Sequence, residues 1–282
     1  MRAGRASMSV ARLVACLLAA SVLLPATGCS RLSFIKPSAE RGKSEQVAPS
    51  YDVSGKGASA RSGENPRAHL LRGEQALREG RAADAEAEAR KALRIDGRSE
   101  LAYTLLALSL DRQGRTADAG EHYARAAELA PTSGAALNNY GSWLCLNGRA
   151  TEAMGWFDRA LADRSYASPA SALANAGACA VEGGQPGRAE RDLRAALGLD
   201  PVNAVALEAL SRHLYAQGEY FEARAFSQRR LDAGPASPAA IRIASQIEEK
   251  LGDKAAAARY VQRLRTEFPH APARLPGDST SR

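Results

Sequence analysis

Apolar residues recur every three to four positions through much of the chain, and the pattern is clearest between Ala135 and Leu161. This period predicts two amphipathic helices in that stretch. The dipeptide Asn147-Gly148 divides them and predicts a tight turn. The stretch therefore predicts a helical hairpin, with one small residue, Gly141 or Ala153, inside each helix.

The same hairpin pattern returns along the chain at a nearly constant interval. A glycine at each predicted turn can adopt the left-handed conformation that ends a helix, and proline stops the second helix of most copies. The turn glycines are Gly80, Gly114, Gly148, Gly184, Gly218 and Gly252, with spacings of 34, 34, 36, 34 and 34 residues. Five positions after them come Ala85, Ala119, Ala153, Ala189, Ala223 and Ala257, and the closing prolines are Pro131, Pro201, Pro235 and Pro269.

Six copies at this interval resemble the tetratricopeptide repeat, whose length is about 34 residues. The resemblance implies an all-α fold, a right-handed solenoid of about six helical hairpins. Each hairpin has two apolar faces, so we expect neighbours to stack and to bury a continuous core. The predicted repeats are residues 66–99, 100–133, 134–169, 170–203, 204–237 and 238–271, followed by a disordered tail at 272–282.

Three copies depart from the common pattern. The first has His69 and Arg72 at positions that are apolar elsewhere, as expected of a terminal repeat that faces water. The fifth has Ser211, Ser227 and Arg230 at core positions, so we expect its packing to be the weakest. The third has two extra residues before the next copy, which predicts a longer connection and a local bend.

The amino terminus has the three parts of a secretory signal. Arginines precede an apolar run that is too short to span a bilayer, and small residues follow it. The tetrapeptide from Ala26 to Cys29 resembles the bacterial lipobox, which implies a signal peptide over residues 1–28 and lipidation of Cys29. Met1 and Met8 are both possible starts, and an ordinary secretory signal is the alternative interpretation.

Residues 29–65 carry few apolar side chains and many Ser, Gly, Lys and Glu residues. Such a segment cannot bury enough surface to offset the entropy of ordering, so we expect a disordered tether behind the lipidated cysteine. A flexible chain of about 35 residues spans roughly 30–35 Å. The repeats would then hang away from a membrane surface.

The sequence contains no motif that indicates catalysis, a metal site or a bound cofactor. Its four histidines are scattered over four repeats, and no phosphate-binding loop or nucleophile elbow is present. The formal net charge is +7, but the basic residues lie among acidic ones and form no stripe, so we expect no nucleic-acid partner. We therefore expect a protein-binding module and not an enzyme.

Two cysteines, Cys145 and Cys179, remain after the signal and the lipidated residue are set aside. They occupy the first helices of consecutive repeats, which lie side by side in this architecture. A disulfide is feasible in an oxidising compartment and is the favoured interpretation. The alternative is that both are small buried apolar residues.

The first helices of such a solenoid line a concave surface, where repeat proteins bind extended peptides. Asn138 and Asn139 are of special interest because an amide can pair with a peptide backbone, although capping or plain exposure is the alternative. The predicted partner-binding groove comprises Leu70, Leu71, Thr104, Leu105, Leu108, Asn138, Asn139, Ser142, Asn175, Arg212 and Tyr215.

Two segments carry a more specific resemblance: NNYG at Asn138–Gly141, followed by WLCLNGR, and NAGAC at Asn175–Cys179. They resemble the type IV pilus biogenesis and stability lipoproteins, tetratricopeptide proteins that act as secretin pilotins. The resemblance implies an outer-membrane lipoprotein that faces the periplasm, is monomeric by itself and binds the pilus secretin or another pilus component. It implies a role in secretin assembly, pilus formation and twitching motility.

Two other interpretations remain open from the sequence. The first is a repeat lipoprotein that serves as an adaptor in outer-membrane barrel assembly or in cell-wall complexes. The second is a lipid-anchored envelope hydrolase, which would need a catalytic cluster that the sequence does not offer.

Overall fold

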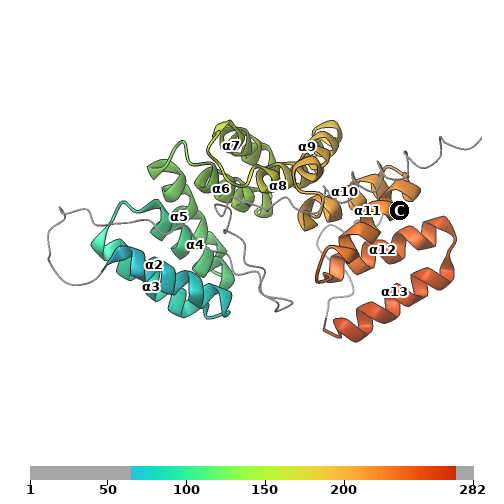
Figure 1. The fold of residues 1–282 in the computed structure, drawn as a ribbon, viewed down its shortest axis with the longest axis horizontal. Helices are drawn as coiled ribbons and strands as arrows, with labels where there is room; N and C mark the ends of the chain where they lie inside the picture. Colours follow the sequence, from blue (N-terminus) through green and yellow to red (C-terminus); the bar gives the residue numbers. More distant parts are fainter. Residues whose placement is uncertain (1–64, 271–282) are drawn as a thin grey trace, which may run out of the picture. The chain divides into compact units, whose positions relative to one another are not determined.

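The computed structural model describes residues 65–270, and these form helices and short connections with no strand among them. The helices pair into six successive hairpins, coloured from blue-green to red along the chain in Figure 1. Their bounds are α2 Pro66–Arg78, α3 Ala82–Ile95, α4 Glu100–Arg112, α5 Thr116–Leu129, α6 Gly134–Leu146, α7 Ala150–Ala162, α8 Pro169–Glu182, α9 Pro186–Leu199, α10 Ala204–Ala216, α11 Tyr220–Asp232, α12 Pro238–Leu251 and α13 Lys254–Glu267.

The turns within the hairpins have the predicted glycine geometry. All six turn glycines have positive φ angles between 67° and 85°, a conformation in which a side chain would be strained. The first helix of most hairpins begins at a side-chain cap: Ser99, Ser133, Asn203 and Ser237 each accept a hydrogen bond from the backbone N–H three residues on. Local sequence therefore determines where these helices begin and end.

Small residues hold the two helices of a hairpin close together. The alanines that follow the turn glycines are completely buried in the first five hairpins, and glycines in the first helices receive large side chains from the second. Gly141 faces the Phe157 ring, and Gly177 faces Leu193. Burying a side chain as large as Phe157 contributes about 2–3 kcal/mol. The predicted close approach of the paired helices is confirmed.

The hairpins stack in chain order. The second helix of each hairpin packs against the first helix of the next, as α7 does against α8, and the first helices also contact one another from α2 through α12. Buried apolar clusters follow one another along the stack and are linked by shared, partly buried side chains such as Val181, Tyr140 and Trp143, as expected of a solenoid.

The connection between α7 and α8 is longer than the others, as the extra residues predicted. It spans residues 163–168, whereas the loops at 96–99, 130–133 and 200–203 have two fewer. Asp163 accepts a hydrogen bond from Gly134 N at 2.9 Å, at the start of α6. Hydrogen bonds from the Ser165 side chain and from backbone N–H groups lower the pKa of Asp163. The longer loop is thus held against α6.

The prediction that the first hairpin exposes its unusual polar residues to water is wrong for His69, which is only 3% exposed. Its Nδ1 lies 2.7 Å from the Glu88 carboxylate, and Arg72 Nε donates to the same oxygen at 3.0 Å. A buried polar group usually needs a hydrogen-bond partner, and this cluster supplies one for Nδ1, whereas His69 Nε2 is buried without a partner. The first hairpin therefore closes on a polar core.

The fifth hairpin also has a partly polar core. Ser211, Ser227 and Arg230 are all buried, and the Arg230 guanidinium donates to the Pro235 carbonyl at 3.2 Å and lies 3.3 Å from Glu208. Ser227 Oγ is buried without a hydrogen-bond partner. These positions are filled, but part of the apolar contact found in other hairpins is replaced by charge pairing.

Several predictions fall outside the described residues. The signal peptide, Cys29 and its tether, and the tail at 272–282 belong to the parts of the chain that precede residue 65 or follow residue 270. Among the described helices, none is both long and apolar enough to cross a membrane.

Glu88→Gln tests the polar core of the first hairpin. Burial alone raises the pKa of Glu88, but hydrogen bonds from Lys91, His69 and Arg72 outweigh it and lower this pKa from 4.5 to about 2. A carboxylate with a depressed pKa stabilises the fold above pH 4.5, and this stabilisation is lost as pH falls toward 2. We expect the variant to lose about 2 kcal/mol of unfolding free energy at neutral pH in chemical denaturation. The gap to wild type should narrow below pH 4.5; equal stability at neutral pH would contradict the assignment.

Gly177→Ala tests the close approach of α8 and α9. A Cβ atom at this position would lie 2.6 Å from Leu193 Cγ and 2.9 Å from Leu193 N. We expect thermal or chemical unfolding to show a loss of about 1–3 kcal/mol. Gly155→Ala in α7 is the matched control, because nothing lies within 4 Å of its Cβ position. That change should stabilise the helix by about 0.5–1 kcal/mol, so equal effects at both glycines would refute the packing argument.

Candidate functional site

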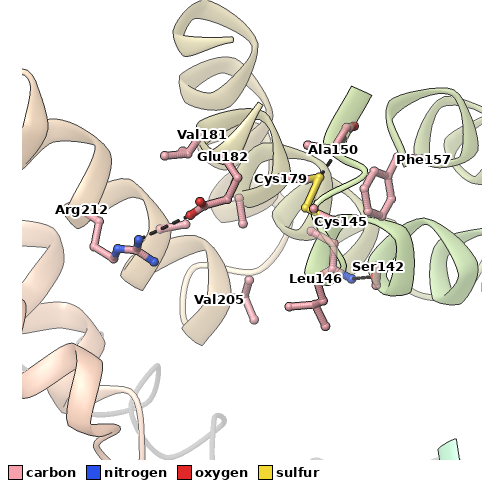
Figure 2. Close-up of a pocket in the computed structure, with 14 residues that line it drawn as sticks. Ser142, Cys145, Leu146, Ala150, Phe157, Cys179, Val181, Glu182, Val205 and Arg212 are labelled. Carbon is pink, nitrogen blue, oxygen red and sulfur yellow. Dashed lines mark hydrogen bonds and ion pairs between the residues drawn. A yellow bond between two sulfur atoms is a disulfide. The ribbon is translucent and has the colours of Figure 1, made fainter. Parts of the chain in front are cut away.

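A cavity of about 650 Å³ opens between the first helices of the third, fourth and fifth hairpins, α6, α8 and α10. Gly148 in the turn after α6 and Phe157 of α7 also line it, and Figure 2 shows the Phe157 ring beside the disulfide. Figure 2 shows Leu146 and Val205 at one edge of the cavity and Glu182 with Arg212 at another. We call this cavity the α6–α8–α10 pocket.

The pocket surface is mainly apolar. Leu146 is 84% exposed and Val205 is 47% exposed, and Val181, Ala178 and Ala209 complete the aliphatic lining. An exposed aliphatic side chain at the edge of a pocket has an unfavourable hydration free energy. A ligand that covers this side chain removes it from water, which favours binding. The pocket is therefore suited to receive an apolar side chain.

A disulfide forms part of the wall. It joins Cys145 of α6 to Cys179 of α8, whose Cα atoms lie 5.8 Å apart and whose sequence separation is 34. Cys179 is buried, whereas Cys145 is partly exposed in the pocket. Cys179 Sγ also lies 4.0 Å from the Ala150 carbonyl oxygen, a packing contact because a disulfide sulfur has no proton to donate. The covalent link holds two sides of the pocket together.

Three predicted polar residues meet between α6 and α8. Asn175 Nδ2 donates to Asn138 Oδ1 and to Ser142 Oγ, each at 3.1 Å. Asn175 Oδ1 makes no hydrogen bond with any described residue, so it remains an acceptor for a ligand N–H. An amide that is fixed in this way can orient a peptide backbone at little entropic cost.

The charged edge of the pocket is loosely paired. Arg212 Nη2 lies 3.4 Å from Glu182 Oε1, and their side chains are 42% and 54% exposed. Exposed pairs of this kind contribute about 0–1 kcal/mol, so a ligand group can replace either partner with little loss. The pocket thus offers one cation and one anion beside an apolar floor.

Three of the predicted groove residues line this pocket: Ser142, Asn175 and Arg212. Two predictions are wrong, because Leu105 and Asn138 are only 4% and 6% exposed and cannot form the surface of a groove. Leu105 packs in the core of the second hairpin, and Asn138 supports Asn175 from below.

The other predicted residues lie away from the pocket. Leu71 borders a separate shallow hollow in the first hairpin, and Leu108 is exposed on α4. Tyr215 packs against Tyr220 with ring centroids 5.5 Å apart, and burial raises its pKa. The remaining members, Leu70, Thr104 and Asn139, are partly buried.

The pocket residues that sequence reasoning missed are mostly aliphatic. Leu146, Val181 and Val205 form its lining, yet apolar residues on a helix first indicate core positions. The available signal was the place of Leu146, directly before the Asn147-Gly148 turn, where the chain leaves the core. Their exposure depends on how neighbouring hairpins are staggered.

A cluster of aromatic residues that packs against the same core as Phe157 and Cys179 was also missed. Trp143 Nε1 donates to the Thr116 carbonyl at 3.0 Å, and its ring fills the space left by Gly120. Tyr140 packs edge-on against Trp156 with centroids 4.8 Å apart. These contacts fix α6 against α5 and α7, and so position one wall of the pocket.

The pocket lining combines apolar, amide and charged groups. Its lining contains a single acid and a single base and no histidine, and the described residues hold no group of three or more His, Cys, Asp and Glu side chains that could bind a metal ion. The arrangement can take up an apolar side chain, a backbone amide and a charged group of either sign.

Comparison with known proteins agrees with the repeat architecture. A model of the tetratricopeptide repeat matches residues 56–100, 104–172 and 179–238, which is more than half of the chain. The chain belongs to the tetratricopeptide repeat family. Its relatives and structural neighbours narrow the picture further.

A curated relative, the type IV pilus assembly protein PilF of Pseudomonas aeruginosa, is 27% identical over 194 residues, covering 68% of this chain and 77% of the relative. The crystal structure of PilW, described as a widely conserved type IV pilus biogenesis factor, matches with a TM-score of 0.66 and 28% identity, covering 73% of this chain and 94% of that one. A structure of Pseudomonas aeruginosa PilF matches with a TM-score of 0.63 at 24% identity, which supports the fold. This repeat protein is related to type IV pilus biogenesis proteins.

Removing the disulfide by Cys145→Ala with Cys179→Ala tests its contribution. Closing a loop of 34 residues stabilises a fold by about 3–4 kcal/mol, chiefly by restricting the unfolded chain. We expect the double variant to unfold at lower denaturant, and reductant to destabilise wild type but leave the variant unchanged. Thiol alkylation of protein purified without reductant supplies the second measurement, and two free thiols at Cys145 and Cys179 would contradict the bridge.

Proposed function

We propose that the protein is an outer-membrane lipoprotein that faces the periplasm and binds a segment of the type IV pilus secretin in the α6–α8–α10 pocket. The observation that carries the proposal is the similarity to PilF and PilW over most of the described repeats. Binding would help the secretin to assemble in the outer membrane and so support pilus formation.

The pocket suggests how such a segment would be held. An aliphatic side chain of the segment covers Leu146, Val181 and Val205, which removes their exposed surface from water. The backbone donates to Asn175 Oδ1 and accepts from the Ser142 hydroxyl. A charged side chain of the segment takes Arg212 or Glu182 from the weak pair between them.

The membrane part of the proposal depends on Cys29, which resembles a lipidation site in sequence. Acyl chains on this residue anchor the protein at about 0.8 kcal/mol for each buried methylene group. The residues between Cys29 and α2 then set how far the repeats reach into the periplasm. Anchoring and binding are separate properties, so they can be tested separately.

Leu146→Asp tests the pocket in cells that carry the variant in place of the wild-type protein. A carboxylate at this edge repels an apolar side chain, and we expect co-purification with secretin, and secretin multimers in the outer membrane, to fall at least about tenfold, equivalent to about 1.4 kcal/mol. Phe221→Asp is the matched control, because Phe221 is 80% exposed on α11 and lies outside the pocket.

The outcomes separate the parts of the proposal. Unchanged secretin multimers with Leu146→Asp would argue against this pocket, and absence of secretin from wild-type material would argue against the partner. Cys29→Ser should release the protein from membranes. The released variant, purified without detergent, should still bind secretin. Loss of binding together with loss of anchoring would show that the two cannot be separated.

A further inference from the structure

The last described helix, α13, exposes a surface that every earlier hairpin buries. One position in the second helix, occupied by Ala89, Tyr123, Phe157, Leu193 and Ser227 in the first five hairpins, is at most 4% exposed. It is packed there against the first helix of its own hairpin, as Phe157 is against Gly141, and also against the first helix of the next hairpin, as Phe157 shares a buried cluster with Ala176 and Ala180 of α8. Val261 occupies the same position in α13 and is 39% exposed.

Neighbouring side chains extend this surface along the helix. Tyr260 and Leu264 are only partly buried, and their spacing from Val261 places all three on one side of α13. The buried residues of α13 are Ala256 and Ala257, at 4% and 6% exposure. We call the surface formed by Tyr260, Val261 and Leu264 the α13 face.

The charge around the α13 face is strongly basic. The helix carries four basic residues, Lys254, Arg259, Arg263 and Arg265, against the single acid Glu267, whereas α5 and α7 each have more acidic than basic residues. Glu267 pairs with Arg263 at 2.7 Å, and Arg259 and Arg265 have no acidic partner among residues 65–270. A ligand that covers this face meets uncompensated positive charge.

The geometry of the stack indicates the shape of that ligand. At the five inner junctions the covering element is an α-helix that lies across the second helix of the preceding hairpin. The equivalent occupant of the α13 face is therefore an amphipathic helix with its apolar side toward Val261. Because Arg259 and Arg265 have no acidic partner among the described residues, we expect acidic residues on both sides of the apolar stripe of this helix.

Charge disfavours two candidates from the chain itself. In a second copy, the outer helix α2 carries three arginines against one glutamate, so its charge would oppose that of α13. The residues after α13 carry two arginines against one aspartate, with prolines at positions 272 and 276. Like charges at an interface disfavour both arrangements.

We propose that the α13 face is a second docking surface, which binds an acidic amphipathic helix of a partner protein as a seventh layer of the stack. It shares no residue with the α6–α8–α10 pocket, so the two surfaces can be occupied at the same time. The partner is defined by its chemistry, an apolar stripe at helical spacing between carboxylates. Binding at the α13 face does not depend on whether the α6–α8–α10 pocket binds secretin.

The test measures binding of two synthetic helical peptides to the full-length mature protein by fluorescence anisotropy. Both peptides carry leucines at i, i+3, i+4 and i+7, and one is flanked by glutamates and the other by lysines. We expect the glutamate peptide to bind at least about tenfold more tightly than the lysine peptide, a difference of about 1.4 kcal/mol. Raising the salt concentration should weaken the binding, because charges at an exposed interface are screened.

Two variants identify the surface. Val261→Asp removes the apolar contact, whereas Arg259→Glu with Arg265→Glu reverses the charge and leaves the apolar contact in place. Each variant should bind the glutamate peptide at least about tenfold more weakly, equivalent to about 1.4 kcal/mol. Leu101→Asp is the matched control, because Leu101 is 58% exposed in the second hairpin. This variant should bind the glutamate peptide as tightly as the wild-type protein does. Circular dichroism and thermal unfolding confirm that each variant is folded.

Three results would overturn the proposal. The first is failure of the glutamate peptide to bind, and the second is equal binding of both peptides. The third is binding to vesicles with anionic lipid that Val261→Asp abolishes, with no binding of the glutamate peptide. That last result would assign the basic α13 face to a membrane surface instead of a partner helix.

Discussion

The structure depends on the close approach of paired helices at small residues. A single alanine position, repeated in each hairpin, is completely buried from Ala85 to Ala223, and a larger side chain there would push the helices apart. Each closed hairpin still has two apolar faces, which only a neighbouring hairpin can cover. Close pairing within hairpins and stacking between them are thus parts of one constraint.

Stacking brings together residues that are about one repeat apart in sequence. Cys145 meets Cys179, and Asn138 meets Asn175, because the first helices of consecutive hairpins lie side by side. The same alignment creates the α6–α8–α10 pocket, whose walls come from three hairpins. None of these three hairpins contains all of the walls, so the pocket is a property of the stack.

The first and last described hairpins differ in the side chains that they place on the face without a neighbouring hairpin. The first hairpin buries His69 with Glu88 and Arg72, so that polar groups are paired where a neighbour is missing. The last hairpin leaves Val261 partly exposed among arginines. A polar cluster at the end of a stack leaves little apolar surface for another protein to cover. An exposed apolar face beside unpaired charge can instead bind a partner of complementary charge.

The sequence by itself determined the helices, their turns and their order of stacking, because helical period, turn glycines and buried alanines are local properties that repeat. It also identified Ser142, Asn175 and Arg212 as residues on the binding side. Only the tertiary structure decided that Asn138 and Leu105 are buried while Leu146 and Val205 are exposed. The physical reason is that a sequence fixes the direction of a side chain relative to its own helix, whereas its exposure depends on how far the adjacent hairpins extend over it.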